Sequence, residues 1–208
     1  LSGVFRNIPG GLLHTNIAVC TVFGAISGSS LATAAAVGSV AYPEMSKRNY
    51  NEPMVVGSLA GGGTLGLLIP PSLSLLIYGA LTETSIGKLF MGGILPGILM
   101  AFLFMLYIFI RCTINPKLWN SDTNNEEVLN SSIVDFLKIW PIGFLIFAVM
   151  GSIVLGIATP TEAAGVGVIS SLLLGLFWGD LSKDKIFKCF YNSAITYGSI
   201  GFVVVGAV

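Results

Sequence analysis

Four long apolar segments set the main constraint on how this chain can fold. Each approaches the roughly 20 apolar residues that a helix needs to cross a bilayer core of about 30 Å. They are Met54–Ala80, Leu89–Ile110, Ile139–Ile157 and Ala163–Trp178. Hydrophobic residues make up 54% of the chain and charged residues only 10%, too few to cover a soluble core. We therefore predict an all-α polytopic membrane protein whose main solvent is the lipid bilayer.

The first part of the chain departs from this pattern. Gly11–Ile26 and Leu31–Met45 are apolar, but each has about 15 residues, or about 22 Å as a helix. Between them lies Ser27-Gly28-Ser29-Ser30, a sequence that no helix favours. Two short arms with a polar tip predict a re-entrant hairpin. Such irregular backbone is tolerated at membrane depth only inside protein or beside a watery cavity.

The order of these segments predicts three regions. They are a transport region over 1–112 (hairpin 11–45, broken helix 54–80, helix 89–111), a cytoplasmic loop over 113–138, and transmembrane helices over 139–208. If both ends of the hairpin lie on one side, nine of the ten basic residues are cytoplasmic and only Lys88 lies opposite. The chain begins at Leu1 and stops inside an apolar run that starts near Phe187, so we expect a fragment of a longer protein.

The hairpin tip is the first candidate site. The first arm presents unpaired carbonyls there and the second arm presents unpaired N–H groups, so both partial charges are available. Hydroxyls of Ser27, Ser29, Ser30 and Thr33 add to the same spot. Uncharged oxygens suit Na⁺, whereas N–H groups and hydroxyls suit a carboxylate. The alternative is close packing of small residues, which is the better interpretation for 34–38.

The second candidate is Gly61-Gly-Gly-Thr-Leu-Gly-Leu-Leu-Ile-Pro-Pro-Ser72, which lies inside an apolar segment. Pro70 and Pro71 lack N–H groups, which frees carbonyls near Gly66 and Leu67 and predicts a break in the helix. We expect Pro71 to be the first residue of a new half-helix, with Ser72 beside its N-terminus. A broken helix next to a re-entrant hairpin is typical of a binding site at the bilayer midplane.

Thr159-Pro160-Thr161-Glu162 allows two interpretations. An acid bordering an apolar segment is a functional candidate. The spacing also matches a capping box, with Thr159 as N-cap and Pro160 as the first helical residue, and this interpretation is favoured. His14 and the cysteines lack metal-ligand spacing, so we predict no transition-metal site. The zero net charge gives no indication of a nucleic-acid partner.

The motifs together resemble the large membrane subunit (M subunit, DctM-like) of TRAP transporters, the tripartite ATP-independent periplasmic carriers of bacteria. They follow the family's order through most of the chain. The matching motifs are Pro9-Gly-Gly-Leu12, Phe23-Gly-Ala-Ile-Ser-Gly-Ser-Ser-Leu-Ala-Thr-Ala-Ala-Ala36, Pro43-Glu-Met45, Gly63-Thr-Leu-Gly-Leu-Leu-Ile-Pro-Pro-Ser72, Tyr78-Gly79, Ser85-Ile-Gly87, Phe90, Pro96-Gly97 and Thr159-Pro-Thr-Glu-Ala-Ala164.

This resemblance implies an elevator-type secondary transporter with two inverted repeats in the bacterial cytoplasmic (inner) membrane. It implies a small membrane subunit and a periplasmic substrate-binding protein as partners. It also implies Na⁺-coupled import of an organic acid, of the sialic acid or C4-dicarboxylate type. Carried over by position, the Na⁺ site comprises Ser27, Ser30 and backbone at Gly66, Ile69 and Pro70. Ser29, Thr33 and Ser72 are expected near the substrate. The family's second hairpin and second break do not occur before Val208, so half of the site is expected elsewhere.

Three alternatives remain open. A stand-alone cation-coupled carboxylate symporter would keep the fold but need no binding protein. A membrane enzyme would need a nucleophile with a base, and the tip serines have no His or Lys neighbour in the apolar segments. A structural scaffold would tolerate bulky residues at the tip. We predict a transporter subunit without catalytic residues.

Overall fold

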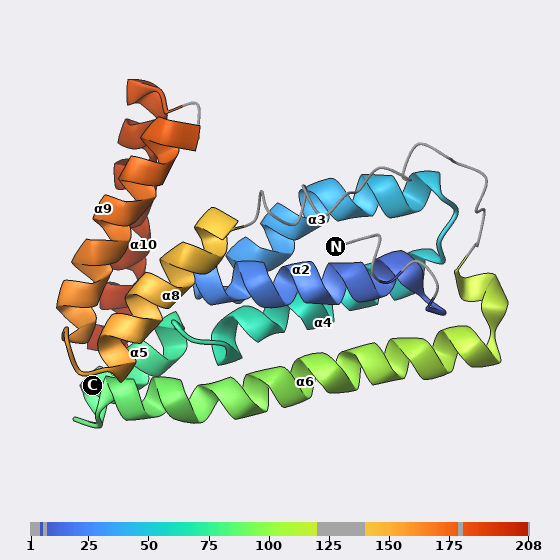
Figure 1. The fold of residues 1–208 in the computed structure, drawn as a ribbon, viewed down its shortest axis with the longest axis horizontal. Coiled ribbons are helices and arrows are strands. Elements are labelled where there is room, and N and C mark those ends of the chain that lie inside the picture. Colours follow the sequence, from blue (N-terminus) through green and yellow to red (C-terminus); the bar gives the residue numbers. More distant parts are fainter. Residues whose placement is uncertain (1–4, 6–7, 120–139, 179–180, 208) are drawn as a thin grey trace. The chain divides into compact units, whose positions relative to one another are not determined.

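The computed structural model describes residue 5 and residues 8–119, 140–178 and 181–207. All regular structure in these ranges is helical (Figure 1). The chain divides into two compact units, Leu1–Ala164 and Gly165–Val208. The first unit contains both candidate sites, and the second contains α10 (Lys183–Ala207) with the greater part of α9 (Pro160–Trp178).

The predicted hairpin is present. Its arms are α2 (Gly11–Ser27) and α3 (Ser30–Lys47), and the chain reverses in the two residues between them. Gly28 adopts the left-handed conformation with φ 60°, which a glycine tolerates best, and its N–H donates to the Gly24 carbonyl. Ser29 is the N-cap of α3, where its hydroxyl accepts from the Ala32 N–H at 3.4 Å. The reversal therefore follows from local chemistry at the tip.

The predicted helix break is also present. α4 (Glu52–Leu68) begins after the N-cap Asn51 and ends at the proline pair, and α5 (Leu73–Leu81) follows. One detail of the prediction is wrong, because Pro71 is not the first residue of the new helix. Ser72 has extended backbone angles and serves as the N-cap, so the irregular segment includes both prolines. The Pro70–Pro71 bond is cis.

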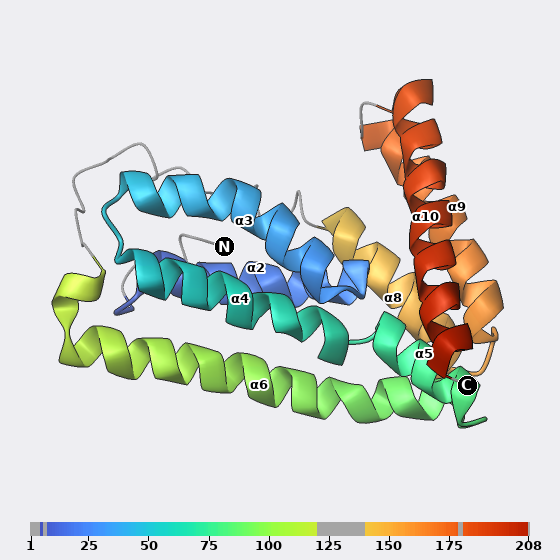
Figure 2. The ribbon, with the colours of Figure 1, turned by 180° about the vertical axis from the view of Figure 1, so that it is seen from behind.

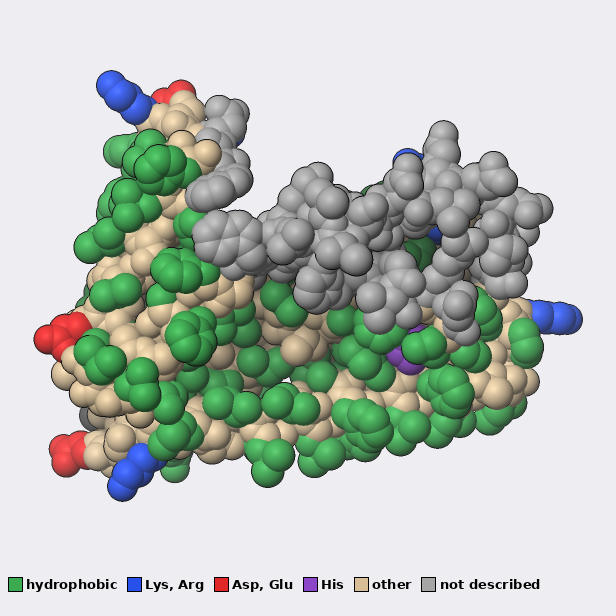
Figure 3. Space-filling view, viewed as in Figure 1, with side chains coloured by type: hydrophobic (Ala, Val, Ile, Leu, Met, Phe, Trp, Pro, Cys, Tyr) green, Lys and Arg blue, Asp and Glu red, His purple; other side chains and the backbone are tan. Residues whose placement is uncertain are grey.

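The long helix α6 (Ile86–Ile114) follows, and a short 3₁₀ turn, η1 (Pro116–Leu118), ends the described part of the predicted loop. Residues 120–139 of that loop lie outside the described residues. Large hydrophobic side chains remain exposed along α6, among them Leu95, Phe102 and Tyr107. They form an apolar band along this helix in Figure 3. Such a surface fits lipid or another membrane segment rather than water.

The helix α8 (Trp140–Val154) is shorter than the predicted span Ile139–Ile157. It ends where the backbone turns, and Gly156 takes a left-handed φ of 69° that a helix cannot continue through. Ile153 of α8 packs in a small apolar cluster with Phe90 and Ala163. The apolar run that starts near Phe187 lies in α10, which has 25 residues.

Within the described residues, four helical stretches are long and apolar enough to cross a membrane: Glu52–Leu81, Ile86–Ile114, Pro160–Phe177 and Lys183–Gly206. Neither hairpin arm is among them, as expected for a re-entrant element. In the described part of the chain, these helices agree with the prediction of an all-α polytopic membrane protein, but the predicted span Ile139–Ile157 is not among them. The sidedness inferred from the basic residues stays a prediction.

The hairpin and the broken helix share one core. In Figures 1 and 2, α2, α3 and α4 run alongside one another, and α4 makes its most extensive contacts with the two hairpin arms. Fully buried apolar side chains join the elements, including Leu13 and Ile17 of α2 and Leu65 of α4. α6 completes the cluster through Ile108 and Cys112. This shared core places the hairpin tip beside the break.

Candidate functional site

The hairpin tip and the helix break are in direct contact. The first N–H of α5, from Leu73, donates to the carbonyl of Gly28 at 3.2 Å. A side chain at position 28 would also meet the Pro71 carbonyl, since an added Cβ would lie 2.7 Å from that oxygen. The two motifs that the sequence predicted to cooperate therefore lie within hydrogen-bonding distance.

Two further glycines allow this close approach. A Cβ at Gly24 would lie 2.9 Å from the Cα of Gly66. A Cβ at Gly66 would lie 2.8 Å from both the Ser29 carbonyl oxygen and the Thr33 hydroxyl. Real Cβ atoms essentially never make contacts this short. These positions need glycine because the α4 backbone lies directly on the tip.

Three oxygens form a compact group beside Gly66, which we term the oxygen triangle: Ser27 Oγ, Thr33 Oγ1 and the Ser29 carbonyl. The two hydroxyls are 2.7 Å apart, and the Thr33 hydroxyl donates to the Ser29 carbonyl at 2.7 Å. Ser27 Oγ lies 3.2 Å from the same carbonyl. Thr33 is fully buried, with 0% of its surface exposed. These oxygens carry no full charge, which makes them suitable ligands for a monovalent cation.

On the other side of the contact, the prolines leave carbonyls without their helical partners. In an unbroken helix the N–H groups of residues 70 and 71 would bond the Gly66 and Leu67 carbonyls, and proline has none. The buried Ser72 hydroxyl replaces one of them by donating to the Leu67 carbonyl at 2.5 Å. Its oxygen lone pairs stay available to accept a further hydrogen bond.

Four helix ends meet at this place, namely the C-terminal ends of α2 and α4 and the N-terminal ends of α3 and α5. The C-terminal ends bring partial negative charge from unpaired carbonyls, and the N-terminal ends bring partial positive charge from unpaired N–H groups. The contact thus combines partial charges of both signs.

The other predicted site residues take different positions. The Ser30 hydroxyl makes no hydrogen bond within the described residues, and the hydroxyl partner of Ser27 is Thr33. Ile69 is the C-cap of α4, and a Cβ at Gly97 of α6 would lie 2.7 Å from its side chain. Pro70 is buried next to it. Their side chains thus pack toward α6, and only their backbone remains a candidate for the site.

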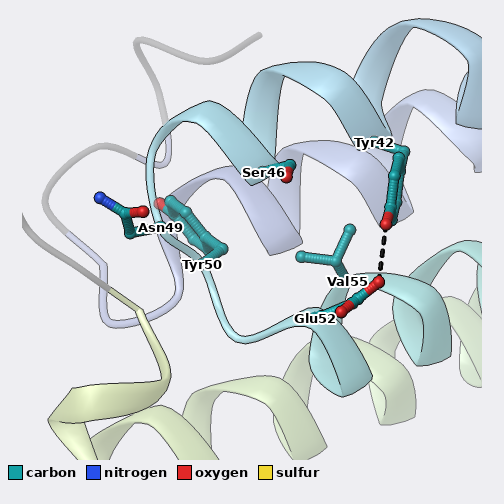
Figure 4. Close-up of a pocket in the computed structure, with 6 residues that line it drawn as sticks. All are labelled: Tyr42, Ser46, Asn49, Tyr50, Glu52 and Val55. Carbon is teal, nitrogen blue, oxygen red and sulfur yellow. Dashed lines mark hydrogen bonds between the residues drawn. The ribbon is translucent and has the colours of Figure 1, made fainter.

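At the opposite end of the hairpin, a shallow cavity of about 320 Å³ separates α3 from the start of α4 (Figure 4). It is lined by Tyr42, Ser46, Asn49, Tyr50, Glu52 and Val55. The Tyr42 hydroxyl donates to Glu52 Oε1 at 2.7 Å, and the Tyr50 hydroxyl accepts from the Leu12 N–H at 3.4 Å. Burial raises the pKa of Tyr50, so its hydroxyl stays protonated at neutral pH. These bonds close the base of the hairpin.

The sequence reasoning missed a buried polar pair. The Asn16 amide donates to the Ser58 hydroxyl at 2.8 Å, and this bond joins α2 to α4. A carboxamide inside an otherwise apolar arm is the signal that could have identified Asn16.

The capping box at the start of α9 is confirmed. The Thr159 N–H and hydroxyl both donate to Glu162 Oε2 at 2.8 Å, and the Glu162 N–H donates back to the Thr159 hydroxyl at 3.4 Å. The helix begins at Pro160, as the spacing predicted.

Comparisons with known proteins cover nearly the whole chain. A family model described as "Tripartite ATP-independent periplasmic transporter, DctM component" matches residues 2–208. The C4-dicarboxylate TRAP transporter large permease protein DctM of Pseudomonas aeruginosa is 35% identical over 202 residues, 97% of this chain and 46% of that protein.

Two other relatives carry different substrate names. The isethionate TRAP transporter permease protein DctMQ of Oleidesulfovibrio alaskensis is 36% identical over 196 residues, 91% of this chain and 29% of that protein. The ectoine/5-hydroxyectoine TRAP transporter large permease protein UehC of Ruegeria pomeroyi is 35% identical over 205 residues, with 97% and 46% covered. The chain thus spans less than half the length of each of the three proteins, and all three names describe permeases.

Proposed function

Since the chain belongs to the DctM component family of the tripartite ATP-independent periplasmic transporters, we propose that it is part of a permease that couples organic-acid import to Na⁺. The observation that carries this proposal is the hydrogen bond between Leu73 and Gly28, which joins a polar hairpin tip to a broken helix. Secondary transporters build their ion and substrate sites from such discontinuous helices.

We assign the cation to the oxygen triangle and the neighbouring Gly66 carbonyl. Ser27 and Thr33 supply hydroxyl oxygens. To bind a cation, these two hydroxyls would give up the hydrogen bond between them. The Gly66 carbonyl has lost its N–H partner to Pro70. Ser30 and the backbone of Ile69 and Pro70 stay predicted members of the same site. The assignment differs from the sequence prediction in moving Thr33 from the substrate to the cation.

We assign the substrate to the side of the contact where helices begin. The N-terminal ends of α3 and α5 direct N–H groups there, and Ser29 and Ser72 contribute hydroxyl oxygens. This combination favours a carboxylate or a similar anionic group. The cargo class is therefore an organic acid. The sialic acid and C4-dicarboxylate types remain its first candidates, and the isethionate and ectoine names of the relatives add two to test.

The rest of the permease completes the proposal. The family implies a small membrane subunit and a periplasmic substrate-binding protein, and a location in the bacterial inner membrane. The relatives' greater length leaves room for a second, inverted repeat with its own hairpin and break, and for elevator-type motion. A stand-alone symporter is the alternative. Purification of the intact permease without any small membrane subunit, together with uptake that needs no binding protein, would favour it.

The cation assignment is tested in proteoliposomes that contain the intact permease and its partner proteins. Ser27→Ala and Thr33→Val remove one hydroxyl each and are expected to raise the Na⁺ concentration for half-maximal uptake about tenfold, or about 1.4 kcal/mol. Thr33→Ser keeps the hydroxyl and should stay near the wild type. Ser39→Ala is the matched control, because that exposed hydroxyl of α3 bonds the Ala36 carbonyl of its own helix.

The same assay distinguishes the two versions of the site. A strong effect of Ser30→Ala without an effect of Thr33→Val would support the sequence-based assignment over the oxygen triangle. If neither change alters Na⁺ activation, the tip does not bind the cation. The cargo itself is identified by a separate experiment, in which uptake of sialic acid, C4-dicarboxylates, isethionate and ectoine by the wild-type permease is compared.

A further inference from the structure

The contacts between α2 and α4 follow a strict repeat. Asn16 meets Ser58, Cys20 meets Gly62 and Gly24 meets Gly66. The partners in each pair are 42 residues apart, and successive pairs are one helical turn further along both helices. The two helices therefore run parallel along one seam. We call it the α2–α4 seam, and it leads from Asn16 to the oxygen triangle.

Along most of this seam, the described residues form no hydrogen bond between α2 and α4. A Cβ at Gly62 would lie 2.9 Å from the Cys20 sulfur, and Gly24 faces Gly66 across bare backbone. Small residues let helices approach closely, but dispersion contacts alone discriminate weakly between neighbouring registers. Of the hydrogen bonds formed by the described residues, only the one from Asn16 to Ser58 joins α2 to α4.

The bond from Asn16 to Ser58 is well placed to favour one register of α2 and α4 over the neighbouring registers. Asn16 is 3% exposed and Ser58 is 6% exposed. The Ser58 hydroxyl also donates to the Val55 carbonyl at 2.8 Å, so its oxygen is the acceptor for the Asn16 amide. A slip of one residue moves the partners by about 1.5 Å and leaves a buried carboxamide without its acceptor. An unsatisfied buried amide destabilises that register relative to the observed one.

The site requires this register. Gly66 must face the Ser29 carbonyl and Thr33, because no other residue fits there. The Gly28 carbonyl must reach the Leu73 N–H. Asn16 itself is about 16 Å from Ser27 along α2, so it contacts neither cation nor substrate.

We propose that Asn16 and Ser58 are positioning residues, which hold α2 in register with α4 and so align the oxygen triangle with the helix break. This inference rests on the proposed function, since it assigns the pair a role in Na⁺ affinity. If the pair stabilised only the core, its loss would lower stability and leave Na⁺ affinity unchanged.

The test uses the purified intact permease. Asn16→Leu and Ser58→Ala each remove the bond. Two quantities are measured for each variant: the melting temperature without Na⁺, and the Na⁺ dissociation constant fitted to the rise of the melting temperature with Na⁺ concentration. The second needs neither cargo nor partner proteins. Val37→Ala is the matched control, because it truncates a buried side chain of α3 and leaves the bond from Asn16 to Ser58 in place.

The expected result is a loss of Na⁺ affinity of about tenfold in both variants, which is about 1.4 kcal/mol. Val37→Ala should lower the melting temperature and leave Na⁺ affinity unchanged. The exchange Asn16→Ser with Ser58→Asn transfers the donor across the seam and should restore much of the affinity. This recovery also addresses the case in which a single variant is too unstable to measure.

Two outcomes would contradict the proposal. Asn16→Leu and Ser58→Ala could behave like Val37→Ala, with lower melting temperatures and the wild-type Na⁺ affinity, or the exchange could fail to recover affinity in a folded protein. Failure of the proposed function looks different, because the wild-type permease would then show no stabilisation by Na⁺ at all.

Discussion

The backbone N–H of Leu73 donates a hydrogen bond to the carbonyl oxygen of Gly28 at 3.2 Å. The donor is the first helical N–H of α5, and the acceptor follows the last residue of α2. Both groups lie at helix ends, where backbone groups lack intrahelical partners. By pairing with each other, they join the chain reversal between α2 and α3 to the break between α4 and α5.

Gly66→Ala tests how closely α4 approaches the tip. The new Cβ would lie 2.8 Å from the Ser29 carbonyl oxygen and from the Thr33 hydroxyl, so the helices must separate. We expect a loss of about 1–3 kcal/mol in stability, together with weakened Na⁺ activation. Thermal unfolding of the intact permease in detergent measures the first effect.

Gly57→Ala is the control for this change, because it lies on the same helix and a Cβ there meets no atom within 4 Å. It should be neutral or slightly stabilising, since alanine favours a helix more than glycine does. Equal melting temperatures for the two variants would show that the tip and α4 are not in close contact.

Ser72→Ala tests the hydroxyl that replaces a missing helical donor. Without it the Leu67 carbonyl loses the partner of a partly buried hydrogen bond, which costs about 0.5–1.5 kcal/mol. Ser74→Ala, which alters an exposed serine of α5, should have little effect. The melting temperatures of the two variants check this expectation. An unchanged value for Ser72→Ala would mean that the bond to Leu67 contributes no stability.

Glu162→Ala removes the carboxylate of the capping box and should lower the melting temperature. Glu162→Gln keeps a side-chain acceptor for the Thr159 N–H and should retain most of the stability. Transport by Glu162→Gln should stay near the wild-type rate, measured as initial uptake into proteoliposomes. Loss of transport in a stable Glu162→Gln protein would instead support the functional interpretation of this acid.

The features that sequence reasoning predicted correctly have local causes. The reversal at Gly28 follows from a glycine among serines, and the end of α4 follows from two adjacent prolines. The capping box follows from the spacing of Thr159 and Glu162. The predictions failed where neighbouring residues compete: Pro71 proved to precede the N-cap Ser72, and α8 ends before its apolar segment does.

Length, apolarity and backbone chemistry act within a few residues, and they were therefore enough to predict a helical membrane protein with a hairpin and a broken helix. Two pairings could be seen only in the folded protein, that of Thr33 with the Ser27 hydroxyl and that of Asn16 with Ser58. The first pairing depends on how the hairpin tip folds, and the second depends on the register of α2 and α4, whose paired residues are 42 positions apart. That register is set by which glycines let backbones approach and by which buried polar groups find partners.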